Sequence, residues 1–202
     1  MDGKATIAFI GVHGVGKTRT AEILSKMGYA YQPLEVIEEA YGLNPLERQL
    51  LFFLSFTKEY LKALRRYKTR VVFDSHPLIV IPYTEYWLRR AEYSWDEITK
   101  LTRIMLETVL LLPKIDLLVY IKPRKYDTVV KRLHLRRRFN VEEEADPEYI
   151  EYIDRRTNLY INKYSHKLAL RMLTIDAEIE AEERAEIVHN VIAKKLSVKI
   201  QS

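Results

Sequence analysis

The sequence contains no cysteine and only six glycines among its 202 residues. The absence of cysteine excludes disulfide bonds and thiolate metal sites. No uninterrupted apolar run approaches the length of about 18 residues that a membrane-spanning helix needs. Residues 1–4 lead directly into an apolar segment, so we expect no signal peptide, no membrane association and a cytoplasmic location. The charged content of 30%, together with the scarcity of glycine, is compatible with a thermophilic source.

Composition favours one globular domain that spans residues 1–202, because 48% of the chain is hydrophobic and the length suits one core. The net charge of +5 raises the alternative of a nucleic-acid-binding module. The basic residues concentrate in one segment, 131–138, without a recognition motif. We therefore do not expect nucleic acid as the main partner.

Three of the six glycines lie in one short segment, residues 11–18, which fits G-x-x-x-x-G-K-[ST] and follows an apolar run. Glycines let several backbone N–H groups approach a polyphosphate, and the following helix directs its positive end at the anion. The pattern predicts a phosphate-binding loop in which Lys17 reaches the β and γ phosphates of ATP and Thr18 ligates Mg²⁺. The expected nucleotide-binding residues are Gly11, His13, Gly14, Val15, Gly16, Lys17, Thr18 and Arg19.

Short β-rich segments alternate with longer helical patterns, which predicts an α/β fold with a parallel sheet and crossover helices. The predicted strands are residues 5–10, 29–33, 70–74, 117–121 and 172–175. The predicted helices cover residues 17–27, 45–67, 95–112 and 181–196, and another begins after Asp146 and Pro147. Gly28 is expected to end the first helix, and Ser94 with Glu97 to form a capping box.

The third predicted strand ends in a carboxylate, Asp74. Ligands of open parallel sheets bind beyond the carboxyl ends of the strands, so we expect Asp74 beside the phosphate loop. There it would hold Mg²⁺ together with Thr18, through a water molecule. The alternative is an aspartate that caps the turn after its strand.

An arginine-rich segment lies between the fourth predicted strand and the next helix. It contains Arg132, Arg136 and Arg138, and acidic residues 142–144 follow it. Guanidinium groups neutralise charge on a transferred phosphoryl group, and a closing flap excludes water. Residues 132–146 are therefore predicted to form a lid with these three arginines as catalytic candidates. An exposed helix end with salt bridges is the alternative.

Carboxylates also follow the second predicted strand, at Glu35, Glu38 and Glu39. A carboxylate at this strand end could deprotonate or orient an acceptor hydroxyl. Glu35 lies nearest the strand and is the first candidate, with Glu38 one turn further along. Either could instead be a charge partner of a helix N-terminus.

The five histidines show no metal-ligand spacing, so we predict no zinc site. His13 is part of the phosphate loop and His76 follows Asp74, so both could line the site. Tyr83, Tyr86 and Trp87 would either stack on a nucleobase or pack in the core.

With these residues placed, the chain resembles P-loop nucleoside and nucleotide kinases, especially thymidylate kinases and deoxyribonucleoside kinases. The resemblance covers nearly the whole chain: the phosphate loop, residues 50–53, 71–74, 115–121 and 173–177, and the arginine-rich lid. It implies a three-layer P-loop kinase fold with a five-stranded parallel sheet flanked by helices. Ribosylnicotinamide kinases are a further resemblance with shorter motifs.

Two departures concern the acceptor. These kinases usually carry an arginine after the acidic residue of the third strand, where this chain has Ser75. An arginine expected in thymidylate kinases on the helix after the second strand is replaced near Ser55 and Phe56. Both changes remove cations that would hold an acceptor monophosphate, so a nucleoside or another small alcohol becomes more plausible.

The sequence thus predicts an ATP- and Mg²⁺-dependent phosphotransferase acting on a nucleoside or a nucleoside monophosphate. Its partners would be the nucleotide donor and a small-molecule acceptor, and a homodimer stays open. The alternative from another class is a nucleotide-binding ATPase or regulatory switch. Asp74-Ser75-His76-Pro77 and Asn162-Lys163-Tyr164-Ser165 do not fit the GTPase patterns D-x-x-G and N-K-x-D, which argues against a guanine switch.

Overall fold

The computed structural model describes residues 4–34, 40, 42–135 and 144–200, with the side chains of the last helix described as far as Lys194. At its centre lies a five-stranded parallel sheet in the order β2-β3-β1-β4-β5. The strands are β1 (Ala5–Ile10), β2 (Ala30–Gln32), β3 (Arg70–Phe73), β4 (Ile115–Lys122) and β5 (Ala169–Asp176). Every predicted strand is confirmed, although β2 is shorter than predicted and β4 and β5 begin earlier.

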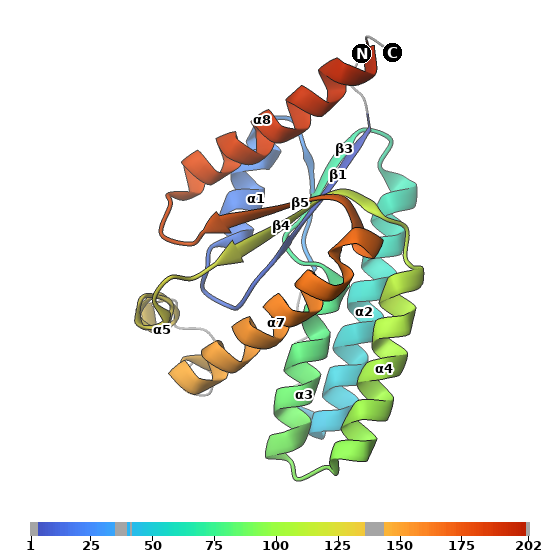
Figure 1. The fold of residues 1–202 in the computed structure, drawn as a ribbon, viewed down its shortest axis with the longest axis vertical. Helices are drawn as coiled ribbons and strands as arrows, with labels where there is room; N and C mark the ends of the chain where they lie inside the picture. The colour runs from blue at the N-terminus through green and yellow to red at the C-terminus, as the bar shows by residue number, and fades with distance from the viewer. Residues whose placement is uncertain (1–3, 35–39, 41, 136–143, 201–202) are drawn as a thin grey trace.

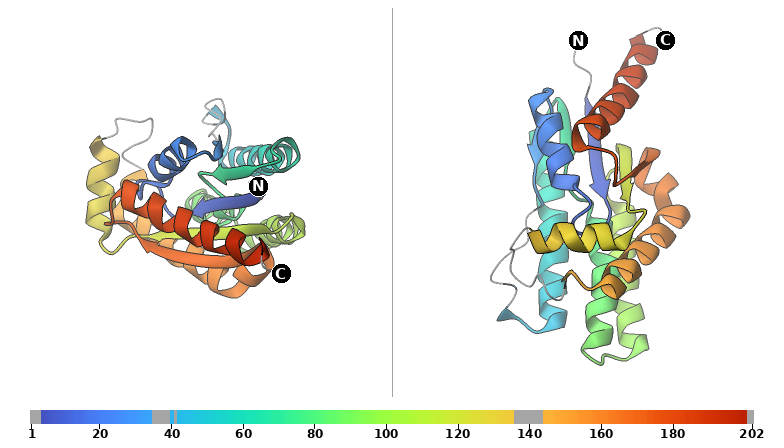
Figure 2. Two further views of the ribbon diagram at one scale, coloured as in Figure 1. Left: turned by 90° about the horizontal axis from the view of Figure 1, so that it is seen from above. Right: turned by 90° about the vertical axis from the view of Figure 1, so that its left-hand side faces the viewer.

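Helices cover both faces of this sheet, which confirms the predicted three-layer P-loop kinase fold (Figure 1). They are α1 (Lys17–Lys26), α2 (Pro45–Arg66), α3 (Val80–Arg90), α4 (Trp95–Leu111), α5 (Tyr126–Leu135), α7 (Pro147–Leu168) and α8 (Ala181–Ile200). Figure 1 shows α1 and α8 together on one side of the sheet and α2, α3, α4 and α7 on the other. Figure 2 shows α5 lying across the end of the sheet where β1 leads into α1.

The predicted helix boundaries follow from local chemistry. Ser94 Oγ accepts from the Glu97 N–H at 3.3 Å and Glu97 Oε2 accepts from the Ser94 N–H at 2.9 Å, which closes the predicted capping box of α4. The Asp146 side chain caps α7 at the Glu148 N–H, with Pro147 as the first helical residue. Gly28 has φ of +89° just after α1, as predicted for a helix-ending glycine.

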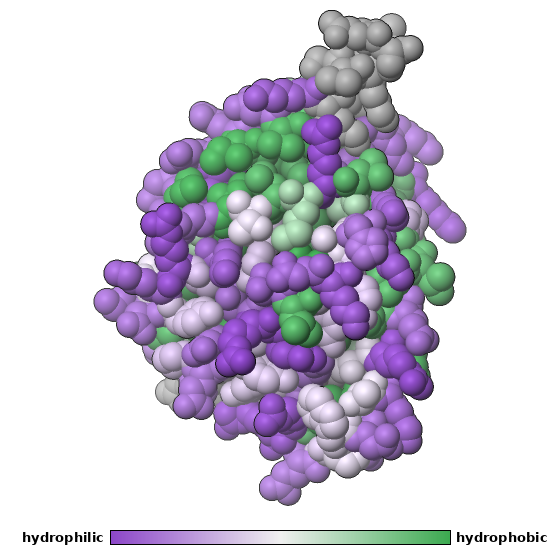
Figure 3. Space-filling view, in the orientation of Figure 1, coloured by the Kyte–Doolittle hydropathy of each residue, from purple (hydrophilic) through white to green (hydrophobic). Residues whose placement is uncertain are grey.

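The core is organised around β1. All six of its residues are buried, as expected for a central parallel strand with helices on both faces. At the sheet edge, β5 is more open, and Leu170 exposes 61% of its surface. Figure 3 shows a hydrophobic area on this side of the molecule, between α8 and β5, within a largely hydrophilic surface. Because Leu170 and Arg171 are both exposed, the early residues of β5 lack the apolar alternation that marks a strand in sequence.

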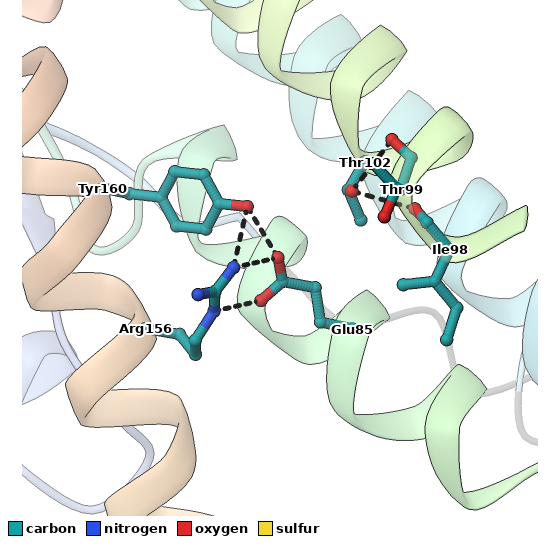
Figure 4. A network of polar contacts seen from close by, with 6 residues as sticks. All are labelled: Glu85, Ile98, Thr99, Thr102, Arg156 and Tyr160. Carbon is teal, nitrogen blue, oxygen red and sulfur yellow. Dashed lines mark hydrogen bonds and ion pairs between the residues drawn. The ribbon is translucent and has the colours of Figure 1, made fainter. Parts of the chain in front are cut away.

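Two helices, α3 and α5, were not predicted as separate elements. Helix α3 begins with a proline in its first turn, which a helix tolerates there, and it lies against α7. A polar network of Glu85, Arg156 and Tyr160 joins α3 and α7 (Figure 4). Among the described helices, none combines enough length with enough apolar character to span a bilayer.

Candidate active site

The predicted phosphate loop connects β1 to α1, and its three glycines all have positive φ. The values are +145° at Gly11, +78° at Gly14 and +91° at Gly16. A Cβ on Gly11 would lie 2.5 Å from the carbonyl oxygen of Ile121 on β4, and one on Gly14 would lie 3.0 Å from side chains of α5. These positions need glycine for both conformation and space. The loop is therefore held between the sheet and the base of the predicted lid.

Lys17 lies at the start of α1, and its ammonium group turns back over the loop. Nζ donates to the carbonyl oxygens of Gly11 at 2.7 Å and Val12 at 2.8 Å. No side chain caps the N-terminus of α1, whose cap residue is Gly16. The N–H groups of the first turn can therefore bind an anion, next to the Lys17 charge.

Asp74 lies directly after β3, the neighbour of β1, so the parallel register brings it beside the phosphate loop. Thr18 Oγ1 donates to Asp74 Oδ2 at 3.3 Å, and the Tyr31 hydroxyl donates to the same oxygen at 2.8 Å. The Leu34 N–H donates to Oδ1 at 3.0 Å. Asp74 is 9% exposed, so these bonds hold a nearly buried carboxylate in one orientation.

A hydroxyl and a carboxylate are oxygen donors of the kind that Mg²⁺ prefers, and Thr18 and Asp74 present them side by side. In the described part of the chain, no group of three or more His, Asp or Glu side chains could hold a metal ion. A cation bound here would therefore take most of its ligands from phosphate oxygens and water. The residues present fit such a site.

Of the predicted lid arginines, Arg132 is described. It lies on α5, and its Nη1 donates to the carbonyl oxygen of Ala177, in the loop after β5, at 3.0 Å. Arg136 and Arg138 lie outside the described residues, and so do Glu35, Glu38 and Glu39. Arg19 is exposed on α1 and pairs with Glu182 at 3.3 Å.

The two histidines have different environments. The His13 ring stacks on the Tyr83 ring, with centroids 4.8 Å apart and planes 18° from parallel, so it joins the phosphate loop to α3. His76 is 1% exposed, and its Nδ1 accepts from the Leu78 N–H at 3.2 Å. Burial lowers the pKa of His76 to about 3. The idea that His76 lines the site is wrong, because the ring is enclosed in the core next to Tyr60.

The aromatic residues of α3 pack mainly against α7. Tyr149 lies 4.7 Å from Tyr86 and 5.7 Å from Trp87, between ring centroids, and 6.1 Å from Tyr83. Burial raises the pKa of Tyr83 and Tyr149 well above the usual value. This arrangement favours the packing alternative for Tyr86 and Trp87. Tyr83, which contacts His13, lies nearest the phosphate loop.

Two site residues were missed from the sequence. Tyr31 on β2 orients Asp74, and nothing in a three-residue strand marks its hydroxyl. Arg184 on α8 is 3% exposed and donates to Val15 in the phosphate loop. One feature of the sequence could have indicated Arg184. A cation in the first turn of a helix is disfavoured by the helix dipole, so its presence suggests a specific contact elsewhere.

The comparisons with known proteins bear on this geometry. No family model matches the chain, and no curated protein is similar to it in sequence. The similar solved structures include three of a deoxyadenosine kinase from M. mycoides. The structure of that enzyme with bound dATP matches this chain with a TM-score of 0.75 at 19% sequence identity. The match covers 93% of this chain and 99% of that one.

The structure of that enzyme with bound dCTP gives a TM-score of 0.72 at 18% identity, over 94% of this chain and 99% of that one. The structure with the products dCMP and a flexible dCDP gives 0.74 at 20% identity, with the same shares. Identities this low concern the fold. The chain has the fold of these P-loop deoxynucleoside kinases along nearly its whole length, as the sequence resemblance implied.

Proposed function

We propose that this protein is an ATP- and Mg²⁺-dependent phosphotransferase that phosphorylates the hydroxyl of a deoxynucleoside. The observation that carries the proposal is the meeting of Lys17, Thr18 and Asp74 at the carboxyl ends of β1 and β3. It combines a cation, an anion-binding loop and a pair of oxygen donors in one place. A kinase needs all three to hold a triphosphate and its metal ion.

On the donor side, the loop N–H groups and Lys17 would bind the β and γ phosphates. Thr18 and Asp74 would hold Mg²⁺, which supplies charge neutralisation on the phosphate oxygens when bound. Tyr31 and the Leu34 N–H keep the Asp74 carboxylate in place. Arg132 and the rest of segment 132–146 would cover the transferred group and exclude water.

On the acceptor side, the hydroxyl oxygen would attack the γ phosphorus while the bond from that phosphorus to its bridging oxygen breaks. The hydroxyl proton would pass to Glu35 or, one turn later, Glu38. The products would be ADP and a nucleoside monophosphate. A neutral acceptor is supported by Ser75, which stands where related kinases carry an arginine. The similar structures are of a deoxyadenosine kinase, and one of them holds the product dCMP.

The test is ADP formation from ATP and Mg²⁺ with panels of deoxynucleosides, ribonucleosides, nucleoside monophosphates and small alcohols. We expect turnover with a deoxynucleoside and loss of nearly all of it in Lys17→Ala. Turnover with nucleoside monophosphates alone would show that the acceptor is a nucleotide and not a nucleoside. ATP hydrolysis that no acceptor stimulates would favour an ATPase or switch, and equal activity of Lys17→Ala would overturn the donor site.

A further inference from the structure

Arg184 is a buried cation beneath the phosphate loop. It lies in the first turn of α8 and is 3% exposed. Its Nη1 donates to Val15 O at 3.1 Å and to Ala177 O at 3.0 Å, and its Nε donates to Thr20 Oγ1 at 3.2 Å. Within the described residues, these partners are all neutral oxygens. Both the burial and the helix dipole act against a positive charge at this position.

The bond to Val15 has a geometric consequence. The Val15 C=O and the Gly16 N–H belong to one planar trans peptide, in which the two groups point in opposite directions. Arg184 binds the oxygen from the α8 side, so the Gly16 N–H is directed to the opposite side. A charged donor on the carbonyl also polarises the peptide and strengthens its N–H as a donor.

Arg184 and Gly16 also fit each other sterically. A Cβ on Gly16 would collide with Arg184 Nη2, and Gly16 has φ of +91°. The guanidinium thus occupies the space behind the glycine that begins α1. The backbone at Gly16 is therefore fixed from behind by Arg184.

A second guanidinium lies close to the first. Arg132 of α5 donates to the same carbonyl oxygen, Ala177 O, as Arg184 does. Burial and the nearby Arg132 charge both lower the pKa of Arg184. The carboxylates of Glu180, Glu182 and Asp176 act in the opposite direction and raise this pKa. An anion bound at the loop would add to their stabilisation of the two guanidinium groups.

We propose that Arg184 is a positioning residue of the donor site, which orients the Gly16 N–H toward the bound polyphosphate through the Val15 carbonyl. The inference rests on the proposed function, since it assumes that the loop binds a nucleotide. Arg184 acts from behind the loop and touches the peptide, with no contact to the phosphates. Its loss should weaken donor binding and leave the acceptor site unchanged.

The first measurement is the affinity for ADP, by calorimetry, of the full chain and of Arg184→Met and Arg184→Lys. We expect binding to weaken about tenfold or more in Arg184→Met, since a hydrogen bond from a charged donor is lost. Arg184→Lys keeps the charge but can reach fewer oxygens, so its affinity should be intermediate. The KM for ATP should rise in both variants while the KM for the acceptor stays within twofold.

The matched control is Asp116→Ala. Asp116 accepts from the Thr6 N–H at 2.8 Å and from Thr6 Oγ1 at 3.0 Å, near the starts of β4 and β1 and so at the opposite end of β1 from the phosphate loop. Its replacement removes partly buried hydrogen bonds and should destabilise the fold, and it should leave the ADP affinity within twofold of wild type. The comparison separates loss of stability from loss of positioning.

A second readout does not depend on ligand binding. The chain has six glycines, so glycine-selective ¹⁵N labelling gives a simple spectrum in which the Gly16 amide can be assigned. We expect the Gly16 signal to shift in ligand-free Arg184→Met and to shift less in ligand-free Arg184→Lys. The lysine variant also provides the test if the methionine variant does not fold. The Gly28 signal should not move.

The outcomes separate the two proposals. Wild-type protein that binds no ADP would overturn the proposed function and, with it, the donor site that Arg184 serves. Wild-type binding that Arg184→Met retains within twofold, with an unmoved Gly16 signal, would overturn the positioning role alone.

Discussion

The guanidinium of Arg156 meets the carboxylate of Glu85 through two parallel hydrogen bonds, Nε to Oε2 at 2.6 Å and Nη2 to Oε1 at 2.5 Å. The Tyr160 hydroxyl adds a third bond to Oε1 at 2.6 Å. The Glu85 side chain is 3% exposed and that of Arg156 30% exposed. This pair holds α3 against α7, with the aromatic residues of both helices packed beside it.

Replacing Arg156 by methionine should destabilise the protein strongly. The substitution leaves the Glu85 carboxylate buried without its counter-charge, at a cost of about 3 kcal/mol in the free energy of unfolding. Urea denaturation at neutral pH measures the change. Lys100→Met, which breaks an exposed pair with Asp96 on α4, should change stability little. Equal effects of the two substitutions would contradict the assignment.

His76 predicts a pH dependence of stability. Its Nδ1 accepts a backbone N–H, so the native ring is neutral, and burial lowers its pKa to about 3. The unfolded chain binds a proton on this group below its ordinary pKa of about 6.5. The unfolded state therefore binds more protons in the window from about 6.5 down to 3, and native stability falls as the pH falls through it.

The loss from this one group should be about 2 kcal/mol between pH 7 and pH 5. His76→Asn keeps an acceptor for the Leu78 N–H and does not titrate. We expect the gap in unfolding free energy between wild type and His76→Asn to narrow by that amount over the same range. Parallel pH profiles would show that His76 is not buried in the neutral form.

The parts of the fold that were predictable are those with local causes. The capping box at Ser94 and the N-cap at Asp146 depend on residues a few positions apart, and each is confirmed. The glycine-rich loop also lies between β1 and α1 as predicted, with positive φ at its three glycines. The early residues of β5 were missed because an exposed edge strand shows no apolar alternation. Helix α3 was missed because its apolar residues and its Pro82 do not mark where it begins.

The residues of the candidate site also divide into those that the sequence could predict and those that it could not. Asp74 could be placed because parallel strands end at one edge of the sheet, which needs only the order of elements. The position of His76 was predicted wrongly because the chain turns back into the core within two residues of Asp74. The roles of Tyr31 and Arg184 depend on contacts across 43 and 169 positions of the chain, which no local pattern encodes.

Gly11 and Gly28 allow two effects of a side chain to be separated. Both have positive φ, +145° and +89°, so alanine is strained at either position. A Cβ on Gly28 would meet nothing within 4 Å, whereas one on Gly11 would overlap the Ile121 carbonyl at 2.5 Å. Gly28→Ala should cost about 1 kcal/mol in unfolding free energy. Gly11→Ala should cost clearly more and weaken ADP binding, and a cost equal to that of Gly28→Ala would contradict this packing.

Asp74→Asn isolates the charge of the carboxylate from its shape. The Leu34 N–H can only donate, so the asparagine oxygen must turn toward it, while the amide nitrogen faces the Tyr31 and Thr18 hydroxyls, which can both accept. The fold should therefore tolerate the change, with a melting temperature close to that of wild type.

The negative charge that would help hold Mg²⁺ is lost in this variant. We expect kcat to fall by about 10- to 100-fold, with a higher Mg²⁺ concentration needed for half-maximal rate. Tyr31→Phe keeps the charge and removes one orienting bond, so its loss should be smaller. Equal kcat values for wild type and Asp74→Asn would leave the carboxylate with a turn-capping role, because an amide oxygen performs that role equally well.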